Sequence, residues 1–145
     1  MTTLSNPRVT PRRPQGAKII GDTGSDHSGP GPDVLGASTL QGDSVLNLVG
    51  DDLGHIEEIM LDIKRGQIAY AVLSFGGIPG VGNKLFAVPW SALVLDADRE
   101  YFILDIPKER LETAPGFDKD QWPSMADPRW QGEIDHYYGA RPYWE

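Results

Sequence analysis

The feature that most constrains the fold is a series of short apolar runs between residues 38 and 106, each bounded by turn-forming residues. The runs are rich in β-branched and aromatic side chains, and their close, regular spacing is typical of antiparallel sandwiches and barrels. No long stretch with helical periodicity separates them, which argues against a parallel α/β sheet. The sequence therefore predicts a mainly β fold with six antiparallel strands, at residues 44–49, 55–63, 67–75, 84–89, 94–96 and 100–106.

Two neighbouring strands of this series are apolar on both faces. Residues 67–75 carry Tyr70 and Val72 on one face and Leu73 and Phe75 on the other, and residues 84–90 repeat the pattern. Strands with this pattern are buried on both sides. We therefore expect a cover for the outer face of this hairpin, provided by the C-terminal segment of the same chain or by a partner.

The C-terminal segment, residues 107–145, is rich enough in aromatic side chains to provide that cover, because it holds seven of the thirteen aromatic residues. Residues 107–113 are typical of a short helical turn. Asp127 and Pro128 are a good N-cap and first-turn pair for a helix that ends at Tyr138, with Gly139 placed to stop it. One face of this helix would carry Trp130, Ile134, Tyr137 and Tyr138. This segment is either docked on the strands or reserved for a partner.

The stretch SFGGIPGVGNKLFAVPW, residues 74–90, has the glycines and the lysine of a phosphate-binding loop but not their order. Such a loop follows a strand and opens a helix, and its lysine is followed by Ser or Thr. Here Asn83 precedes Lys84, Leu85 follows it, and the next residues are typical of a strand. We interpret the stretch as a hairpin loop whose glycines permit positive φ.

The N-terminal residues 1–36 differ sharply from the rest of the chain. They contain five prolines and six glycines and no aromatic residue, so we expect a disordered arm. Its cluster of Arg8, Arg12 and Arg13 is interpreted as part of a solvated tail, with a tether to an anionic surface as the alternative.

The formal net charge of −8 disfavours direct binding to nucleic acid, because the phosphate backbone is also negative. The absence of cysteine excludes disulfides, thiolate metal sites and a cysteine nucleophile. No apolar run is long enough to cross a bilayer, and the N-terminus lacks the apolar core of a signal peptide. We expect a cytoplasmic protein, for which peripheral membrane association stays open.

No catalytic constellation is evident. The three histidines, His27, His55 and His136, are scattered, and no G-x-S-x-G motif occurs. Asp51, Asp52, His55 and Glu57 offer oxygen and imidazole ligands that would suit a divalent cation if the turn brought them together, as would Asp96, Asp98 and Glu100. Acidic residues of turns are more often simply solvated, so we predict no metal site, no cofactor and no enzymatic activity.

Residues 39–106 resemble the PRC-barrel domain, through LGHIEEIMLDIKRGQIAYAVLSFGG, the glycine hairpin and KLFAVPWSAL. The tail, with WPSMADPRW and YYGARPYW, is similar to that of stand-alone bacterial PRC-barrel proteins. The resemblance implies a small, six-stranded, partly open antiparallel barrel at residues 37–106, after the arm at 1–36 and before the extension at 107–145. Related domains form the cytoplasmic part of the photosynthetic reaction centre H subunit and half of a ribosome maturation factor. We expect residues 1–36 to form neither the membrane helix of the first nor the additional barrel of the second.

The resemblance, together with the hairpin that is apolar on both faces, predicts a non-enzymatic docking or assembly module. The predicted contact residues are Phe75, Ile78, Phe86, Trp90, Tyr137, Tyr138, Tyr143 and Trp144. Homodimerisation is the simplest way to cover the hairpin without another partner. A small-molecule or ion sensor centred on residues 51–57 is one alternative. An accessory role in ribosome assembly or in a photosynthetic complex is another, since acidic surfaces suit basic proteins.

Overall fold

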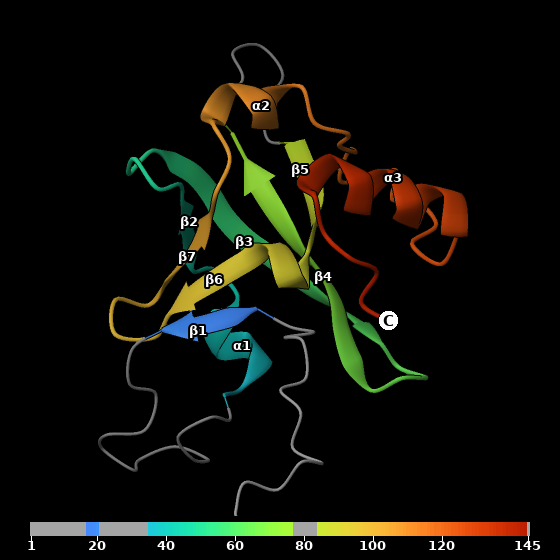
Figure 1. Ribbon diagram of the computed structural model, residues 1–145, viewed down its shortest axis with the longest axis horizontal. Coiled ribbons are helices and arrows are strands. Elements are labelled where there is room, and N and C mark those ends of the chain that lie inside the picture. The colour runs from blue at the N-terminus through green and yellow to red at the C-terminus, as the bar shows by residue number, and fades with distance from the viewer. Residues whose placement is uncertain (1–16, 21–34, 77–83, 145) are drawn as a thin grey trace, which may run out of the picture.

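The computed structural model describes residues 17–20, 35–76 and 84–144, and every structural statement below concerns these residues. They form one seven-stranded sheet with three short helices and a 3-10 turn around it (Figure 1). The strands are β1 (Lys18–Ile20), β2 (Ser44–Leu46), β3 (Asp52–Asp62), β4 (Gln67–Phe75), β5 (Lys84–Pro89), β6 (Leu93–Asp96) and β7 (Tyr101–Leu104). The helices are α1 (Ala37–Leu40), α2 (Lys108–Glu112) and α3 (Pro128–Tyr138), and η1 (Trp90–Ala92) is the 3-10 turn.

The mainly β prediction is confirmed, whereas the six-stranded antiparallel detail is wrong. The strand order is β1-β6-β7-β2-β3-β4-β5, so the sheet is not closed. The pairs β2–β3, β3–β4, β4–β5 and β6–β7 are antiparallel, but β2–β7 and β1–β6 are parallel. Turn spacing fixes the direction only of strands that are joined by a hairpin. The strands β2 and β7 are far apart in the chain, so local sequence could not set their relative direction.

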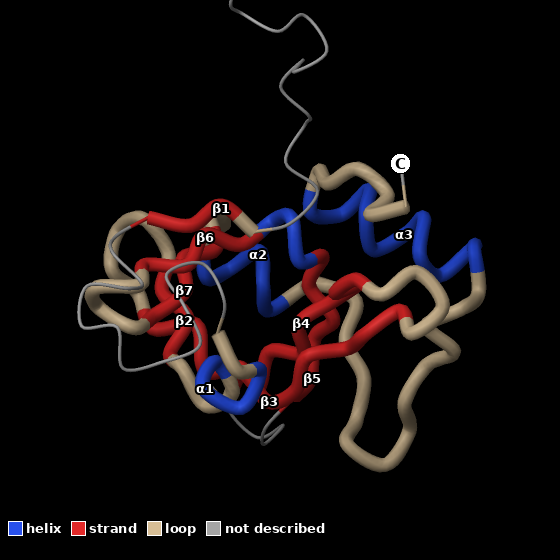
Figure 2. Tube along the Cα trace, turned by 90° about the horizontal axis from the view of Figure 1, so that it is seen from below, coloured by secondary structure: helices blue, strands red, loops and turns tan. Residues whose placement is uncertain are grey.

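The additional strand, β1, comes from the stretch that was expected to be a disordered arm. Residues Lys18–Ile20 pair in parallel with Val94–Asp96, and the N–H of Ala97 donates to the Ile20 carbonyl at 2.8 Å. Figures 1 and 2 both place β1 beside β6. Two consecutive isoleucines favour a strand, and the pairing with β1 provides hydrogen-bond partners for the backbone groups along the edge of β6. The arm expectation is thus wrong for these three residues, and the boundaries at 36 and 106 stay predictions.

The main hydrophobic core lies between the inner faces of the curved sheet and is closed by α2. Its fully buried members come from every strand from β2 to β7, which ties both ends of the sheet to one core. They include Val45, Leu53, Ile56, Leu73, Phe86, Leu93, Phe102, Leu104 and Leu111. No helix in the described part of the chain is long and apolar enough to span a membrane.

Gly54 lies at a close approach of two strands of the sheet. It lies in β3 at a φ of +117°, next to the register shift between β2 and β3. A Cβ at this position would lie 2.0 Å from the carbonyl oxygen of Ser74 in β4. Glycine is required here for both the backbone conformation and the space.

We predict that Gly54→Ala lowers the free energy of unfolding by roughly 1–3 kcal/mol from the strained conformation alone, with the overlap adding to the loss. Gly66→Ala is the matched control, because Gly66 also has a positive φ, +67°, but a Cβ there would meet nothing within 4 Å. Urea unfolding of both variants measures the difference. Equal losses would show that the approach to Ser74 does not constrain β3.

Candidate functional site

The outer face of the β4–β5 hairpin is covered by the C-terminal segment of the same chain. A second hydrophobic cluster joins Tyr70 and Ala87 of the hairpin to Ile134 of α3 and to Tyr143 beyond it. Figure 1 shows one end of α3 beside β5. Of the two covers that the sequence allowed, the structure therefore has the intramolecular one.

Helix α3 begins and ends where the sequence predicted. The side chain of Asp127 accepts a hydrogen bond from the N–H of Arg129 at 2.9 Å, and Pro128 occupies the first turn. The helix ends at Gly139, whose φ of +65° is left-handed and whose N–H caps the last carbonyls. The predicted face is confirmed, because Ile134 is buried and the three aromatic residues of that face pack against the clusters below.

The segment between α2 and α3 adds a backbone contact at the edge of the sheet. Leu85 of β5 and Phe117 exchange two backbone hydrogen bonds, of 3.0 and 2.8 Å. Gly116 permits this approach, since a Cβ there would lie 2.8–2.9 Å from atoms of Lys84, Leu85 and Phe86. Some of the free backbone hydrogen-bonding groups of the edge strand β5 are thereby paired within the chain itself.

Helices α2 and α3 are joined by a reciprocal pair of contacts. Arg110 donates from Nη2 to the carbonyl of Tyr137 at 2.6 Å, and the Tyr137 hydroxyl donates to the carbonyl of Arg110. The guanidinium also lies 4.6 Å from the centroid of the Tyr137 ring. Tyr137 is therefore engaged within the chain.

The end of the chain is fixed to the β3–β4 turn by one carboxylate. Oδ2 of Asp62 accepts from the Tyr143 hydroxyl at 2.7 Å and from Nη1 of Arg65 at 3.1 Å. Oδ1 accepts from the backbone N–H groups of Lys64 and Arg65. The hydrogen bond from Tyr143 and those from Arg65 lower the pKa of Asp62 to about 2. Burial and the bond to Asp62 raise the pKa of Tyr143 to about 12.

Aromatic contacts extend this connection into the second cluster. The ring of Tyr70 meets those of Trp130 and Tyr143 edge-on, with centroids 5.2 and 5.9 Å apart, and Trp144 meets Tyr143 at 5.0 Å. Such arrangements stabilise beyond the area they bury. The tail is thus held by ring packing as well as by a hydrogen bond.

A groove of about 670 Å³ opens where this tail passes the β3–β4 turn. We call it the hairpin groove; its lining residues are 60–65, 69, 70, 125, 126, 128, 131, 143 and 144. Three of its large apolar side chains are exposed to solvent. They are Leu61, Trp144 and Ile63, the last of which is 87% exposed. A cluster of exposed apolar side chains next to a concave surface is typical of an interaction site.

The predicted contact residues occupy very different environments. Phe75 and Phe86 are fully buried in the main core, so their assignment as exposed contact residues is wrong. Both side chains point to the inner face of the β4–β5 hairpin. The sequence alone could not show which face of the hairpin is the inner one. Ile78 lies outside the described residues.

The other predicted contact residues belong mostly to the docked tail. Trp90, Tyr137 and Tyr138 are half-buried against the main core, and Tyr143 is buried. Only Trp144 combines exposure with a place in the hairpin groove. A role of these residues in contacts with another protein stays a prediction.

Sequence reasoning missed Leu61 and Ile63. Both were assigned to a strand of the barrel and were given no role in binding. A usable signal was present, because two apolar residues flank Asp62 directly before the Lys64–Gly66 turn, where few elements can cover them.

The acidic turn does not assemble a metal site. Asp51 accepts from Nδ2 of Asn47, Asp52 accepts from the N–H of Gly54, and His55 faces Glu57 at 3.4 Å. Within the described ranges, no three His, Asp or Glu side chains are placed to hold an ion. The segment 74–90 runs from strand β4 to strand β5, as predicted, although residues 77–83 of its loop lie outside the described ranges.

We predict opposite effects for two glycine substitutions in the C-terminal segment. Gly116→Ala lowers the free energy of unfolding by about 1–3 kcal/mol, because its methyl group overlaps β5. Gly132→Ala raises it by roughly 0.5–1 kcal/mol, because this helical position has open space and alanine favours the helix. Both are read from urea unfolding. A neutral Gly116→Ala would place the 116–117 segment away from β5 in solution.

We predict that Tyr143→Phe raises the pKa of Asp62 from about 2 toward its ordinary value of 3.8. A depressed carboxyl pKa stabilises the fold above about pH 4, and this contribution is lost as the pH falls toward 2. The variant therefore loses less stability over this acid range than the wild type does. Carboxyl carbon NMR titration measures the pKa directly, with Tyr101→Phe as a control at a distant hydroxyl. An unchanged Asp62 pKa would contradict the contact.

Comparison with known proteins assigns the chain to a family. No curated protein matches the chain. Among solved structures, one similar chain is the 16S ribosomal RNA processing protein RimM from Pseudomonas aeruginosa, with 15% identity and a TM-score of 0.37. The match covers 58% of this chain and 49% of that one, so it spans about half of RimM. The family model of the PRC-barrel domain matches residues 32–111, more than half of the chain. The chain belongs to the PRC-barrel domain family.

Proposed function

We propose that the protein is a non-enzymatic docking module that binds another protein chain at the hairpin groove. The observation that carries this proposal is the exposure of Leu61, Ile63 and Trp144 around one concave surface. Leaving these side chains in water is unfavourable, and their burial by a partner would contribute about 25 cal/mol per Å² of apolar area. The C-terminal tail already covers the outer face of the β4–β5 hairpin, whereas the groove at the β3–β4 turn stays open.

A protein suits this surface better than a small molecule does. Small-molecule sites enclose most of the ligand within a pocket. Here Ile63 is almost fully exposed on the rim, where only a broad partner surface could bury it. The aromatic and methionine side chains of the groove, among them Trp144, Met60 and Met125, are also types that are enriched in protein interfaces.

The ionisable groups of the groove favour a non-catalytic role. General acid–base catalysis needs a group whose pKa lies near the working pH. Asp62 has a pKa of about 2 and Tyr143 one of about 12, and hydrogen bonding between them accounts for part of both shifts. This pair serves to fix the tail.

The biological process in which this module acts depends on which protein it binds. Related PRC-barrel domains serve in ribosome maturation and in a photosynthetic complex, and both settings are candidates that partner identification separates. The ion-sensing alternative receives no support from the acidic turn, since its side chains are not grouped around a common point in the part of the chain that the structure describes.

We predict that a photo-crosslinking amino acid at position 63 traps a defined protein in native host cells, whereas the same probe at position 35 does not. Leu35 is a fair control, because it is 37% exposed, as Trp144 is, and does not line the groove. The double substitution Leu61→Ser with Ile63→Ser should abolish crosslinking by a probe at position 144. Its urea midpoint should stay close to that of the wild type, because both side chains are exposed. Equal crosslinking from positions 63 and 35 would contradict the proposal.

A further inference from the structure

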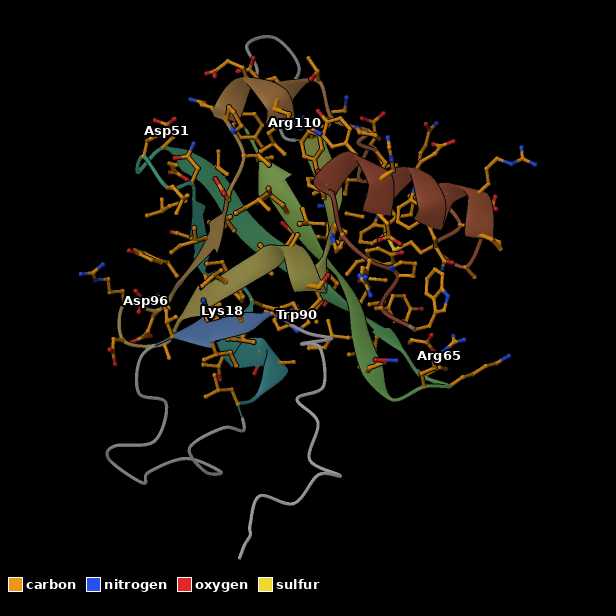
Figure 3. All side chains as sticks on the ribbon, viewed as in Figure 1. Lys18, Asp51, Arg65, Trp90, Asp96 and Arg110 are labelled. Atoms are coloured by element: carbon orange, nitrogen blue, oxygen red, sulfur yellow. The ribbon has the colours of Figure 1, made fainter. Side chains whose placement is uncertain are left out.

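A second exposed apolar surface lies at the opposite end of β3 from the hairpin groove. Leu48 and Val49 occupy the turn that precedes β3, and Val49 is 81% exposed. Eight residues of β3, 52–59, lie between this turn and the groove, which is about 26 Å along the strand at about 3.3 Å per residue. In Figure 3, Asp51 and Arg65 mark these two ends.

The turn that carries Leu48 and Val49 is rigid, because the buried side chain of Asn47 holds its backbone. Oδ1 of Asn47 accepts from the N–H groups of Val49 and Asp51, at 3.2 and 2.8 Å. Its Nδ2 donates to the Asp51 carboxylate and to the carbonyl of Ile106. The two apolar side chains are therefore presented on a fixed backbone, which reduces the entropy lost on binding.

The two ends carry opposite local charge. A hollow of about 220 Å³ beside the turn is lined by Leu48 and Val49 and by the carboxylates of Asp51, Asp105 and Glu109. None of these three has an ion-pair partner among the described residues.

The hairpin groove is lined by Lys64 and Arg65. Arg65 is paired with Asp62 at 3.1 Å, whereas Lys64 forms no ion pair with any residue that the structure describes. An apolar surface with an acidic rim thus lies at one end of β3, and an apolar groove with a basic rim lies at the other.

We propose that the Leu48–Val49 turn of a second copy occupies the hairpin groove. The two aliphatic side chains would pack against Leu61, Ile63 and Trp144, while the acidic rim of the turn would face Lys64. This proposal rests on the proposed function of the groove and names its occupant. Complementary charge selects this occupant over a second groove, because two basic rims repel each other.

The contact is head-to-tail, since it joins two different surfaces. A pair related by a twofold axis would use the same surface on both copies. Here each contact leaves one turn and one groove free, so further copies can add. Both surfaces are small and the net charge of −8 opposes association, so the contact belongs to the weak, concentration-dependent class.

Sedimentation velocity on the full chain, up to millimolar concentration, tests this contact with two complementary variants. The turn variant carries Leu48→Ser and Val49→Ser, and the groove variant carries Leu61→Ser and Ile63→Ser. The wild type should form species larger than dimers as its concentration rises, whereas each variant alone should stay monomeric. An equal mixture should form a dimer and no larger species, because one intact turn meets one intact groove. Leu35→Ser should behave as the wild type does.

An exchange of charges between the two surfaces tests the electrostatic contribution to the proposed contact. Lys64→Glu should weaken association roughly two- to fivefold, and adding Glu109→Lys to the same chain should restore it. In the mixture of turn and groove variants, amide NMR shifts should move at residues 47–51 of the groove variant.

A wild type that is monomeric at every concentration would overturn the proposal, as would a turn variant that still dimerises. If crosslinking from position 63 nevertheless traps a different protein, the docking function survives and only its occupant changes. If position 63 traps nothing and the chain is also monomeric, both proposals fail.

Discussion

The structure depends on the need to cover both faces of the β4–β5 hairpin. The inner face, with Phe75 and Phe86, contributes to the main core, and the outer face, with Tyr70 and Ala87, would otherwise be an apolar surface in water. The C-terminal segment buries this outer face within the same chain, because Ile134 and Tyr143 pack against it. The sheet can therefore stay open at β5 without exposing its hairpin.

This intramolecular cover determines where contacts with other proteins can be made. Most aromatic side chains of the tail are used to hold it in place, through ring contacts with Tyr70, the Tyr143–Asp62 hydrogen bond and the Arg110–Tyr137 pair. One exposed apolar surface lies where the cover ends, at the tip of the β3–β4 hairpin. A binding surface at that tip can serve a partner without displacing the tail, so binding and folding are separable.

Much of the fold could be predicted from local sequence. Continuous apolar runs rich in β-branched and aromatic residues identified β4 and β5, and Asp127, Pro128 and Gly139 set the ends of α3. The parallel pairing of β2 with β7 could not be predicted, because no turn joins these strands. The candidate site was predicted less well. Period-two alternation shows that Phe75 and Tyr70 face opposite sides, but which side is solvent-facing depends on where the distant tail packs.

Hydrogen exchange of backbone amides at a concentration where the protein is monomeric tests the central claim most directly. If the tail covers the hairpin within one chain, the amides of α3 around Ile134 are protected together with those of β4 around Tyr70. Fast exchange in α3 beside a protected sheet would contradict this account. It would mean that the tail is free and that its aromatic face is reserved for a partner.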